Sequence, residues 1–219
     1  MNTELTLYGY WRSSAAYRVR IALNLKGLAY QQVPVHLVKD GGQQRSAEYQ
    51  ALNPQELLPL LVDKGNGGVR IAQSLAILEY LDEVFPTPAL LPSDPAQRAQ
   101  VRALALHIAC DLHPLNNLRV LQYLTGELGV GEPAKDVWYR HWLHKGLAAV
   151  EAGMAVFNDR LSLGERPGYL EACLVPQLYN ARRFNCDLDA YPRILAMAAR
   201  CDSLDAFKQA APEVQPDAQ

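Results

Sequence analysis

The chain has 219 residues, and its 21 Lys and Arg residues nearly balance its 23 Asp and Glu residues, leaving a formal net charge of −2. This balance argues against nucleic-acid binding, which relies on clustered basic residues. No apolar run approaches the roughly 18 residues that a membrane span needs. The first residues also lack the basic and apolar regions of a secretory signal. We therefore expect a cytoplasmic protein with neither nucleic-acid nor membrane partners.

Residues 1–85 alternate between strand-like and helical patterns. Leu5–Tyr10 alternates apolar with other residues, as a half-buried strand does. Ala16–Lys26 has apolar residues at helical spacing and ends before Gly27, a suitable terminator. Strands are predicted at 5–10, 30–37, 60–62 and 69–72, and helices at 16–26, 43–52 and 74–85. Pro34 should place the second strand at a sheet edge or at a bulge. This order of elements predicts a small mixed sheet with helices packed on it.

The pattern changes after residue 85. Residues 86–95 contain four prolines, which is typical of a stiff linker. Beyond them, apolar residues recur at three- and four-residue intervals, as on a buried helix face, at Val101, Leu104, Ile108, Leu112 and Leu115. Further helices are predicted at 134–158, 169–184 and 193–209, and Pro114 and Pro176 should kink or end theirs. We expect an α/β domain at 1–85, a linker at 86–93 and an all-helical domain at 94–219.

The junction between the first strand and the first helix carries two adjacent serines, Ser13 and Ser14. At the positive end of a helix, free backbone N–H groups and a hydroxyl could hold an anion or a thiolate. Serine is also common as a plain N-cap, so both interpretations stay open here.

Three other segments are suggestive only in combination. Pro59 directly precedes a predicted strand, and a cis Leu58–Pro59 bond there would turn the Leu58 backbone toward a ligand, although trans bonds are far commoner. Gln73 and Ser74 open a helix, where they could hold a carboxylate or where Ser74 could simply act as the N-cap. The polar glycine loop that ends in Gln43 and Gln44 could line a cleft or be exposed.

Neither the histidines nor the cysteines indicate a metal site. His141 and His144 have helical spacing, but no third ligand accompanies them, and we expect no bound metal. The cysteines are far apart and form no ligand pattern, so we expect reduced thiols that pack as small apolar side chains.

Six segments in one collinear order resemble the zeta class of glutathione transferases, and most closely its maleylacetoacetate isomerase members: SSAAYRVRIALNLKG, VKDGGQQ, ALNPQELLP, AQSLAILEYL, PTPALLPSDP and LVPQLYNARRF. The resemblance extends from about residue 4 to residue 216. It implies the glutathione transferase fold, in which a thioredoxin-like N-terminal domain (βαβαββα) precedes an all-helical C-terminal domain. It further implies a homodimer and glutathione as the cofactor, bound mainly by the first domain.

The resemblance also assigns residues to the site. Ser13 aligns with the first serine of the family motif and is our choice for orienting the glutathione sulfur, with Ser14 as the alternative. Arg12 is a catalytic and substrate-binding residue by the same comparison, and Arg183 matches an arginine that binds a substrate carboxylate. The remaining glutathione-binding residues implied are Gln43, Gln44, Leu58, Pro59, Gln73, Ser74, His113 and Asn117.

The implied activity is glutathione-dependent cis–trans isomerisation of maleylacetoacetate to fumarylacetoacetate in tyrosine and phenylalanine breakdown. Reversible addition of a thiolate makes the double bond single for a moment, so that it can rotate. Arginines suit the small dicarboxylate-like substrate because their planar fork bonds both carboxylate oxygens. Three alternatives stay open: a maleylpyruvate isomerase of gentisate breakdown, a general transferase acting on small α-halo acids, and a non-catalytic binding protein.

The sequence departs from the family pattern at two positions. Ala15 stands where many members have a cysteine, which should not affect a mechanism that uses the sulfur of glutathione. Gly168 replaces the usual Ser or Thr N-cap of a long helix, while Glu171 can still reach back to the cap. We expect this exchange to lower stability by at most about 1 kcal/mol without loss of activity.

Overall fold

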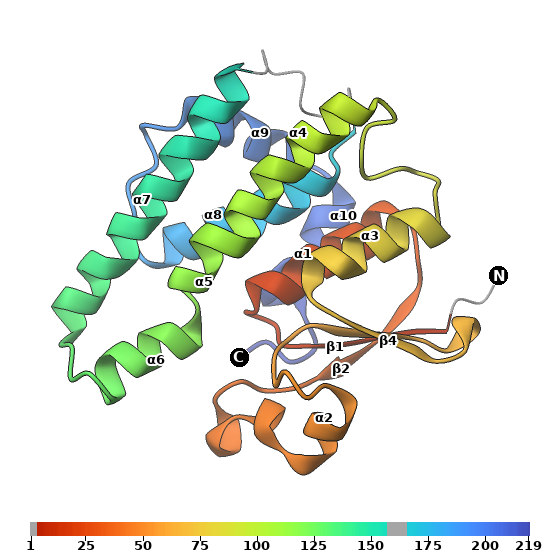
Figure 1. Ribbon diagram of the computed structural model, residues 1–219, viewed down its shortest axis with the longest axis horizontal. Coiled ribbons are helices and arrows are strands. Elements are labelled where there is room, and N and C mark those ends of the chain that lie inside the picture. The colour runs from red at the N-terminus through yellow and green to blue at the C-terminus, as the bar shows by residue number, and fades with distance from the viewer. Residues whose placement is uncertain (1–3, 157–165) are drawn as a thin grey trace. The chain divides into compact units, whose positions relative to one another are not determined.

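The computed structural model describes residues 4–156 and 166–219 (Figure 1). The chain divides into two units, Met1–Leu90 together with Asp202–Gln219, and Leu91–Cys201. Residues 202–219 were expected in the second domain, but they pack on the first unit. The reason is a pair of hydrogen bonds from the first helix: Arg20 Nε donates to the Ala210 carbonyl at 2.9 Å, and Asn24 Nδ2 donates to the Ala206 carbonyl at 3.0 Å.

Four strands form the sheet of the first unit, in the spatial order β2-β1-β3-β4. Their bounds are β1 Leu5–Gly9, β2 Tyr30–Pro34, β3 Leu60–Asp63 and β4 Val69–Ala72. Strand β1 pairs in parallel with β2 and antiparallel with β3, and β3 pairs antiparallel with β4. Strand β2 therefore lies at an edge, as the proline in it predicts. A glycine-rich turn joins β3 and β4 into a hairpin, with Gly67 at φ +67°.

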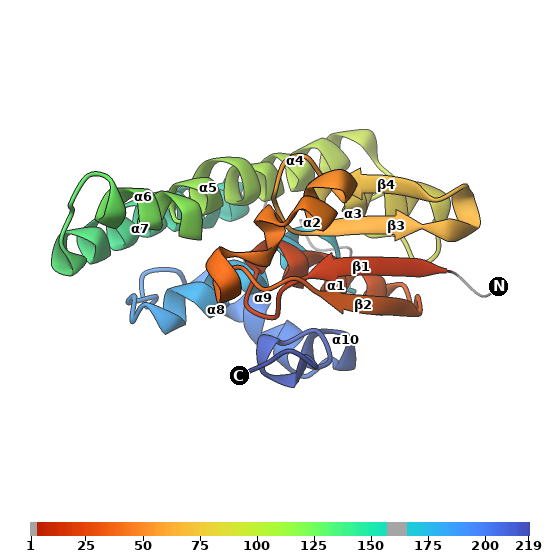
Figure 2. The ribbon, with the colours of Figure 1, turned by 90° about the horizontal axis from the view of Figure 1, so that it is seen from below.

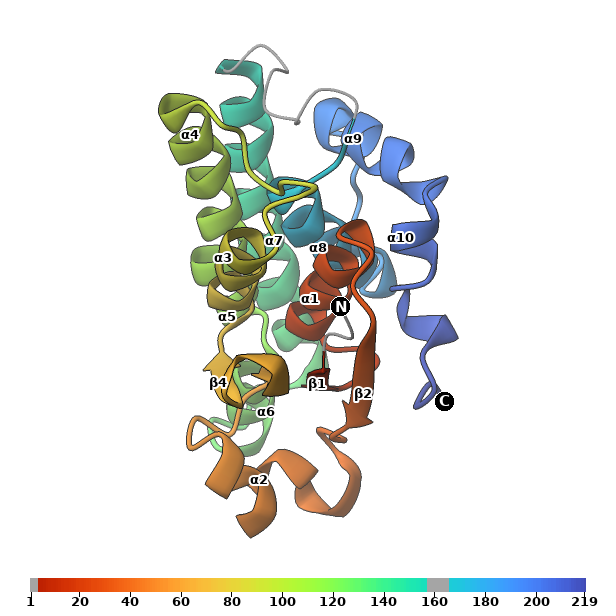
Figure 3. The same cartoon turned by 90° about the vertical axis from the view of Figure 1, so that its right-hand side faces the viewer.

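Helices cover both faces of this sheet (Figure 3). On one face lie α1 (Ser14–Leu25) and α3 (Ser74–Val84), and on the other lies α2 (Ala47–Leu52). The helix predicted over 43–52 is α-helical only in its second half, because the side chain of Ser46 accepts the Tyr49 N–H and starts α2 there. The preceding residues form two short 3₁₀ turns, Lys39–Gly41 and Gln43–Arg45. Helix α10 (Asp205–Lys208) contacts α1.

Side-chain alternation along the strands separates two packed layers. Leu5, Leu7 and Leu61 are almost completely buried on one face of the sheet. On the other face, Leu60 packs with Tyr49 of α2 in a smaller cluster. The sheet is thus held from both sides, which fixes the loops that leave its ends.

The described residues of the second unit are mainly helical. The helices are α4 (Pro95–Leu106), a π-helical segment at His107–Leu112, α5 (His113–Leu115), α6 (Leu118–Gly126), α7 (Glu132–Val156), α8 (Tyr169–Arg183) and α9 (Pro192–Asp202). The helix predicted at 134–158 corresponds to α7, and its last two residues lie outside the described ranges. Gly146 of α7 allows a close approach to Leu112, since a side chain at this glycine would overlap that leucine.

The two helix-breaking prolines behave differently. The helix that contains Pro114 ends after Leu115, close to the expected point. Helix α8 continues through Pro176, because most of its residues, including that proline, are buried against the rest of the unit. At its start, the Gly168 N–H donates to Glu171 Oε2 at 2.9 Å, so the expected return of Glu171 to the cap is confirmed.

Candidate functional site

The loop from β1 to α1 ends in Ser13, which caps the helix. Its Oγ accepts the Ala16 N–H at 3.2 Å, so the capping interpretation is confirmed. The side chain is half-buried, and a hydroxyl that accepts one hydrogen bond still has a proton to donate. The N–H groups of the first helical turn point out of the N-terminal end of α1, and the helix itself offers them no acceptor. This end of α1 therefore has donors for a negatively charged group.

The two neighbours of Ser13 differ in access. Ser14 is the first residue of α1 and only 5% exposed, whereas Arg12 is exposed. The Arg12 guanidinium lies 4.5 Å from the centre of the Trp11 ring, and its Nη2 donates to the Tyr10 hydroxyl at 3.2 Å. Arg12 is thus held beside Ser13 with its charge accessible. Ser13 is the more accessible of the two serines.

The Leu58–Pro59 bond is cis, the less common of the two isomers. Within the described chain, the backbone N–H and C=O of Leu58 have no hydrogen-bond partner. The preceding carbonyl, that of Leu57, accepts the Tyr49 hydroxyl at 2.7 Å and Asn53 Nδ2 at 2.9 Å. Burial raises the pKa of Tyr49 to about 12, so this hydroxyl stays protonated and donates at physiological pH. The Leu58 backbone is therefore displayed from an anchored loop.

The start of α3 differs from the prediction at Ser74. The N-cap is Gln73, at φ +71°, and Ser74 is the first helical residue. The expectation that Ser74 acts as the N-cap is therefore wrong. Its buried hydroxyl instead accepts Arg18 Nη1 of α1 at 3.1 Å. Gln73 is exposed, and its Nε2 donates to Gln55 Oε1 at 2.7 Å.

The two glutamines of the polar loop have different environments. Gln43 is tied to the loop itself, because its Oε1 accepts the His36 N–H at 2.9 Å. Gln44 is 9% exposed, and its Oε1 finds no partner among the described residues. Gly42, at φ +102°, allows the Gln44 amide to pack against the backbone, since a Cβ there would lie 2.6 Å from its Nε2. Gln44 thus retains an acceptor for a further hydrogen bond.

Strand register brings these segments of the first unit to one end of the sheet (Figure 2). Tyr8 near the end of β1 pairs with Leu60 at the start of β3, which pairs with Ala72 at the end of β4. Gly9 pairs with Pro34 at the end of β2. The same end of the sheet therefore carries the loops that contain Arg12, Ser13, Leu58, Gln73 and Gln44.

The other predicted residues belong to the second unit. Asn117 caps α6, where its Oδ1 accepts the Arg119 N–H at 3.2 Å, and His113 is half-buried at the start of α5. Arg183 is exposed at the end of α8, with its guanidinium 5.0 Å from the centre of the Phe184 ring.

Tyr139 of α7 connects the segments that carry these residues. Its ring stacks on Phe184 at 3.8 Å between centroids, and its carbonyl accepts Asn116 Nδ2 at 3.2 Å. Burial raises the pKa of the Tyr139 hydroxyl, and the nearby Arg183 charge opposes this shift. Tyr139 thus contacts Asn116 through its backbone carbonyl and Phe184, the neighbour of Arg183, through its ring.

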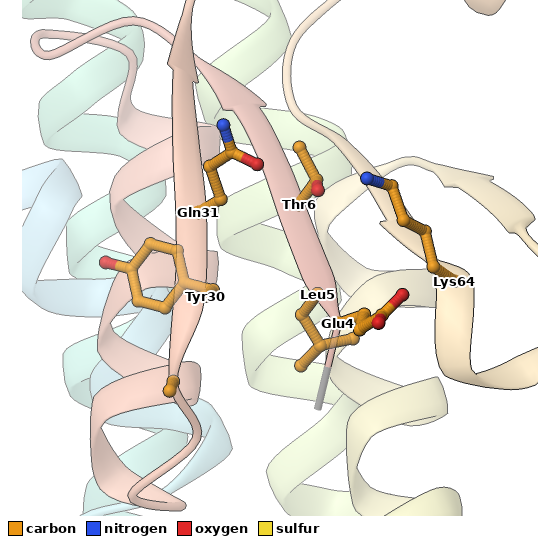
Figure 4. Close-up of a pocket in the computed structure, with 7 residues that line it drawn as sticks. Glu4, Leu5, Thr6, Tyr30, Gln31 and Lys64 are labelled. Carbon is orange, nitrogen blue, oxygen red and sulfur yellow. The ribbon is translucent and has the colours of Figure 1, made fainter. Parts of the chain in front are cut away.

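A cavity of about 380 Å³ lies at the opposite end of the sheet and includes none of the predicted residues (Figure 4). It is lined by Glu4, Leu5, Thr6, Ala29, Tyr30, Gln31 and Lys64. In residues 4–156 and 166–219, no group of three or more His, Cys, Asp and Glu side chains is arranged to bind a metal ion. No helix in these ranges is long and apolar enough to span a membrane.

Several residues around the predicted ones were not anticipated. Tyr10 orients Arg12, Gln55 orients Gln73, and His36 organises the polar loop by accepting the Val38 and Lys39 N–H groups at its Nδ1. Tyr10 and His36 lie two or three positions from their partners, whereas Gln55 and Gln73 are 18 positions apart. The expectation that all four cysteines are packed inside also fails at Cys110, which is exposed, whereas Cys173, Cys186 and Cys201 are buried.

Comparisons with known proteins agree on one family. The family described as "Glutathione S-transferase, N-terminal domain" matches residues 3–83. A probable maleylacetoacetate isomerase from Vibrio cholerae is 55% identical over 98% of this chain and 99% of its own length. The holo structure of a maleylpyruvate isomerase, described as a bacterial glutathione S-transferase in the zeta class, is 46% identical, with a TM-score of 0.91, and the match covers 98% of this chain and all of the other. Maleylacetoacetate isomerase from Anaeromyxobacter dehalogenans with bound GSH is 42% identical, with a TM-score of 0.85, over all of this chain and 99% of the other.

Proposed function

We propose that this chain, which belongs to the zeta class of glutathione transferases, isomerises maleylacetoacetate to fumarylacetoacetate in tyrosine and phenylalanine breakdown, with glutathione as its cofactor. The observation that carries the proposal is the gathering of Arg12, Ser13 and the Leu58 backbone at one end of the sheet. The relative from Vibrio cholerae, a probable maleylacetoacetate isomerase, supports the choice of substrate.

The first unit offers the groups that glutathione requires. The Leu58 backbone can pair with the cysteinyl unit, because its N–H and C=O have no partner in the described chain. The start of α3, at Gln73 and Ser74, can hold the γ-glutamyl carboxylate through backbone N–H groups. Gln43 and Gln44 would serve the glycyl end, where a side-chain amide N–H can donate to the carboxylate. The relative with bound GSH supports this cofactor.

Bound glutathione supplies the thiol whose thiolate adds reversibly to the double bond. Ser13 and the start of α1 promote ionisation, because hydroxyl and backbone donors at a helix N-terminus lower a thiol pKa from its usual ~8.5. Arg12 stabilises the negative charge that develops on the substrate and binds one of its carboxylates.

Residues of the second unit take the roles that the resemblance implies. Arg183 binds the second substrate carboxylate, and its exposed guanidinium is held in place by the Phe184 ring. His113 and Asn117 contact glutathione. The first unit is therefore the glutathione-binding part of the protein, and the second supplies substrate-side residues.

Maleylpyruvate is the second candidate substrate. The holo structure of a zeta-class maleylpyruvate isomerase is 46% identical to this chain with a TM-score of 0.91, which favours it specifically. Both substrates carry two acidic ends, so Arg12 and Arg183 suit either of them.

An absorbance assay with each cis substrate, with and without glutathione, tests the proposal. We expect isomerisation of maleylacetoacetate that requires glutathione. Isomerisation that proceeds equally well without glutathione would contradict the thiolate mechanism. Activity confined to maleylpyruvate would contradict maleylacetoacetate as the substrate. Arg183→Lys is the matched variant for carboxylate binding: it keeps the charge but loses the fork, so its KM should rise more than its kcat falls.

We further propose a cytoplasmic homodimer. Val69 on the edge strand β4 and Val84 on α3 are 37% and 41% exposed, and a second copy would cover such apolar side chains. Light scattering of the purified protein should give twice the mass of the chain, and Val84→Glu should shift it toward the monomer. A wild-type monomer at working concentrations would refute the dimer.

A further inference from the structure

The C-terminal segment binds the loop that carries Arg12 and Ser13. Asp217 Oδ2 accepts the Trp11 backbone N–H at 3.0 Å, across 206 positions of sequence. The other carboxylate oxygen, Oδ1, lies 3.4 Å from Gln32 Nε2 of β2, which donates to it. Asp217 is half-buried in this position. A segment that follows every helix of the second unit thus reaches the first loop of the chain.

One rigid peptide unit connects Asp217 to Ser13. The peptide between Tyr10 and Trp11 contains both the N–H that Asp217 accepts and the Tyr10 carbonyl, which accepts the Ser13 N–H at 2.9 Å. Because a peptide unit is planar, its N–H and C=O turn together. Because Asp217 holds the Trp11 N–H, it also fixes the direction of the Tyr10 carbonyl, which accepts the Ser13 N–H.

A second contact holds the next peptide unit. Arg20, which is 1% exposed, donates from Nη2 to the Trp11 carbonyl at 2.9 Å and from Nε to the Ala210 carbonyl at 2.9 Å. Hydrogen bonds from a charged donor are stronger than neutral ones. The C-terminal segment thus fixes Trp11 on both sides, directly through Asp217 and indirectly through Ala210 and Arg20.

The position of Trp11 sets that of Arg12 as well as Ser13. The Arg12 guanidinium rests on the Trp11 ring, 4.5 Å from its centre. A site that must align a thiolate, a hydroxyl and a guanidinium tolerates displacements of about 0.5 Å. Turning the Tyr10–Trp11 peptide would move both side chains at once.

We infer that Asp217 is a positioning residue: through the Trp11 N–H it keeps Arg12 and Ser13 in the arrangement that the reaction needs. This inference rests on the function proposed for the loop. It assigns to the C-terminal segment a part in activity, beyond its packing on α1.

Asp217→Leu and Asp217→Asn test this role, with Glu213→Leu as the control. Leucine keeps the approximate size but removes both acceptors, whereas the asparagine amide oxygen can still accept the Trp11 N–H. Glu213 is an exposed acidic residue of the same segment. We expect Asp217→Leu to lower kcat/KM by up to about 100-fold, mainly through kcat. Its pH–rate profile should move to higher pH, because Ser13 and the helix end would stabilise the thiolate less well. Asp217→Asn should recover most of the activity.

Hydrogen exchange in the ligand-free protein provides the structural readout. The Trp11 and Ser13 amides should exchange faster in Asp217→Leu than in wild type. In Glu213→Leu their exchange rates should equal those of wild type. An Asp217→Leu protein with wild-type kcat, KM and pH profile overturns the inference, and so does one that loses only thermal stability. Wild-type protein that isomerises neither substrate refutes the proposed function instead, which separates the two failures.

Discussion

Lys26 Nζ donates a hydrogen bond to Asp82 Oδ1 at 2.8 Å, and the lysine side chain is completely shielded from solvent. The same ammonium group donates to the carbonyls of Phe85 and Pro88, each at 2.8 Å. Asp82 in turn accepts the Leu90 N–H at 2.7 Å. One ion pair therefore joins the end of α1 to α3 and to the start of the proline-rich linker.

Replacing this lysine should destabilise the protein. Lys26→Met keeps the apolar stem but leaves the Asp82 carboxylate and two carbonyls without their donor. Removing one partner of a buried ion pair costs about 3–5 kcal/mol. Urea unfolding followed by circular dichroism measures the loss, and Lys64→Met, at an exposed lysine, is the control. A difference from the control below about 1 kcal/mol would contradict the importance of this pair.

Ser13→Ala should affect stability and turnover, and Ser46→Ala separates the two effects. Both serines cap a helix through a 3.2 Å bond from a backbone N–H, so each alanine variant should lose about 1 kcal/mol of stability. Of these two variants, only Ser13→Ala should also lower kcat, because the proposed function gives Ser13, and not Ser46, the role of donating to the thiolate. Equal kcat values in the two variants would show that the Ser13 hydroxyl does not activate the thiol.

Ser14→Ala completes this comparison. Ser14 is 5% exposed within the first turn of α1. We expect a smaller loss of kcat than for Ser13→Ala, since a buried hydroxyl is less accessible to a ligand. Steady-state kinetics at saturating glutathione provide the test, and a larger loss for Ser14→Ala would exchange the roles of the two serines.

Glu171 predicts a pH dependence of stability. Burial raises the pKa of this carboxyl above its ordinary value of 4.5, against the opposing hydrogen bond from Gly168 and the charge of Arg200. Between that ordinary value and the raised one, the folded state binds more protons than the unfolded state. The contribution of Glu171 to stability therefore falls as the pH rises through this window.

Glu171→Gln should remove this dependence while keeping an acceptor for the Gly168 N–H. The free energy of unfolding of the variant, relative to wild type, should rise as the pH increases above the ordinary carboxyl pKa of 4.5. Urea titrations at several pH values measure it, with Glu213→Gln as the exposed control. A difference between Glu171→Gln and wild type that stays constant with pH would refute this prediction.

Tyr139 predicts a stabilising substitution. Its hydroxyl is buried and has no partner among the described residues, while its ring stacks on Phe184. Tyr139→Phe keeps the stack and removes the buried hydroxyl, so we expect a gain of about 1 kcal/mol. Tyr139→Leu should instead cost at least about 2 kcal/mol, because the stack and much of the packing are lost. Urea unfolding of both variants checks the order, and destabilised Tyr139→Phe would reveal a partner for the hydroxyl.

Local sequence patterns were sufficient where neighbouring residues decide the structure. Alternation located β1, helical spacing and Gly27 located α1 and its end, and Pro34 placed β2 at the edge of the sheet. The serine before α1 was a cap by its position alone, and so it is in the structure. Each of these features depends on contacts within a few residues.

The same patterns failed at Ser74 and in the C-terminal segment. Serine is a preferred residue at N-caps, but the Ser74 hydroxyl accepts a hydrogen bond from Arg18 of α1, 56 positions away. The helix predicted at 193–209 continues past residue 202, yet hydrogen bonds to Arg20 and Trp11 hold residues 202–219 on the first unit. Nothing near these residues in the sequence indicates such partners.

The near-neutral charge, the absence of an apolar run and the six family segments followed from the sequence by itself, because they are properties of residue identity and order. Only the tertiary structure decided which polar groups are anchored and which keep an open hydrogen-bonding position, such as Gln44 Oε1 and the Leu58 backbone. It also decided that Asp217 holds the loop before Ser13. The physical reason is that a hydrogen bond depends on distance in space, and the path of the chain brings together groups that the sequence separates by up to 206 positions.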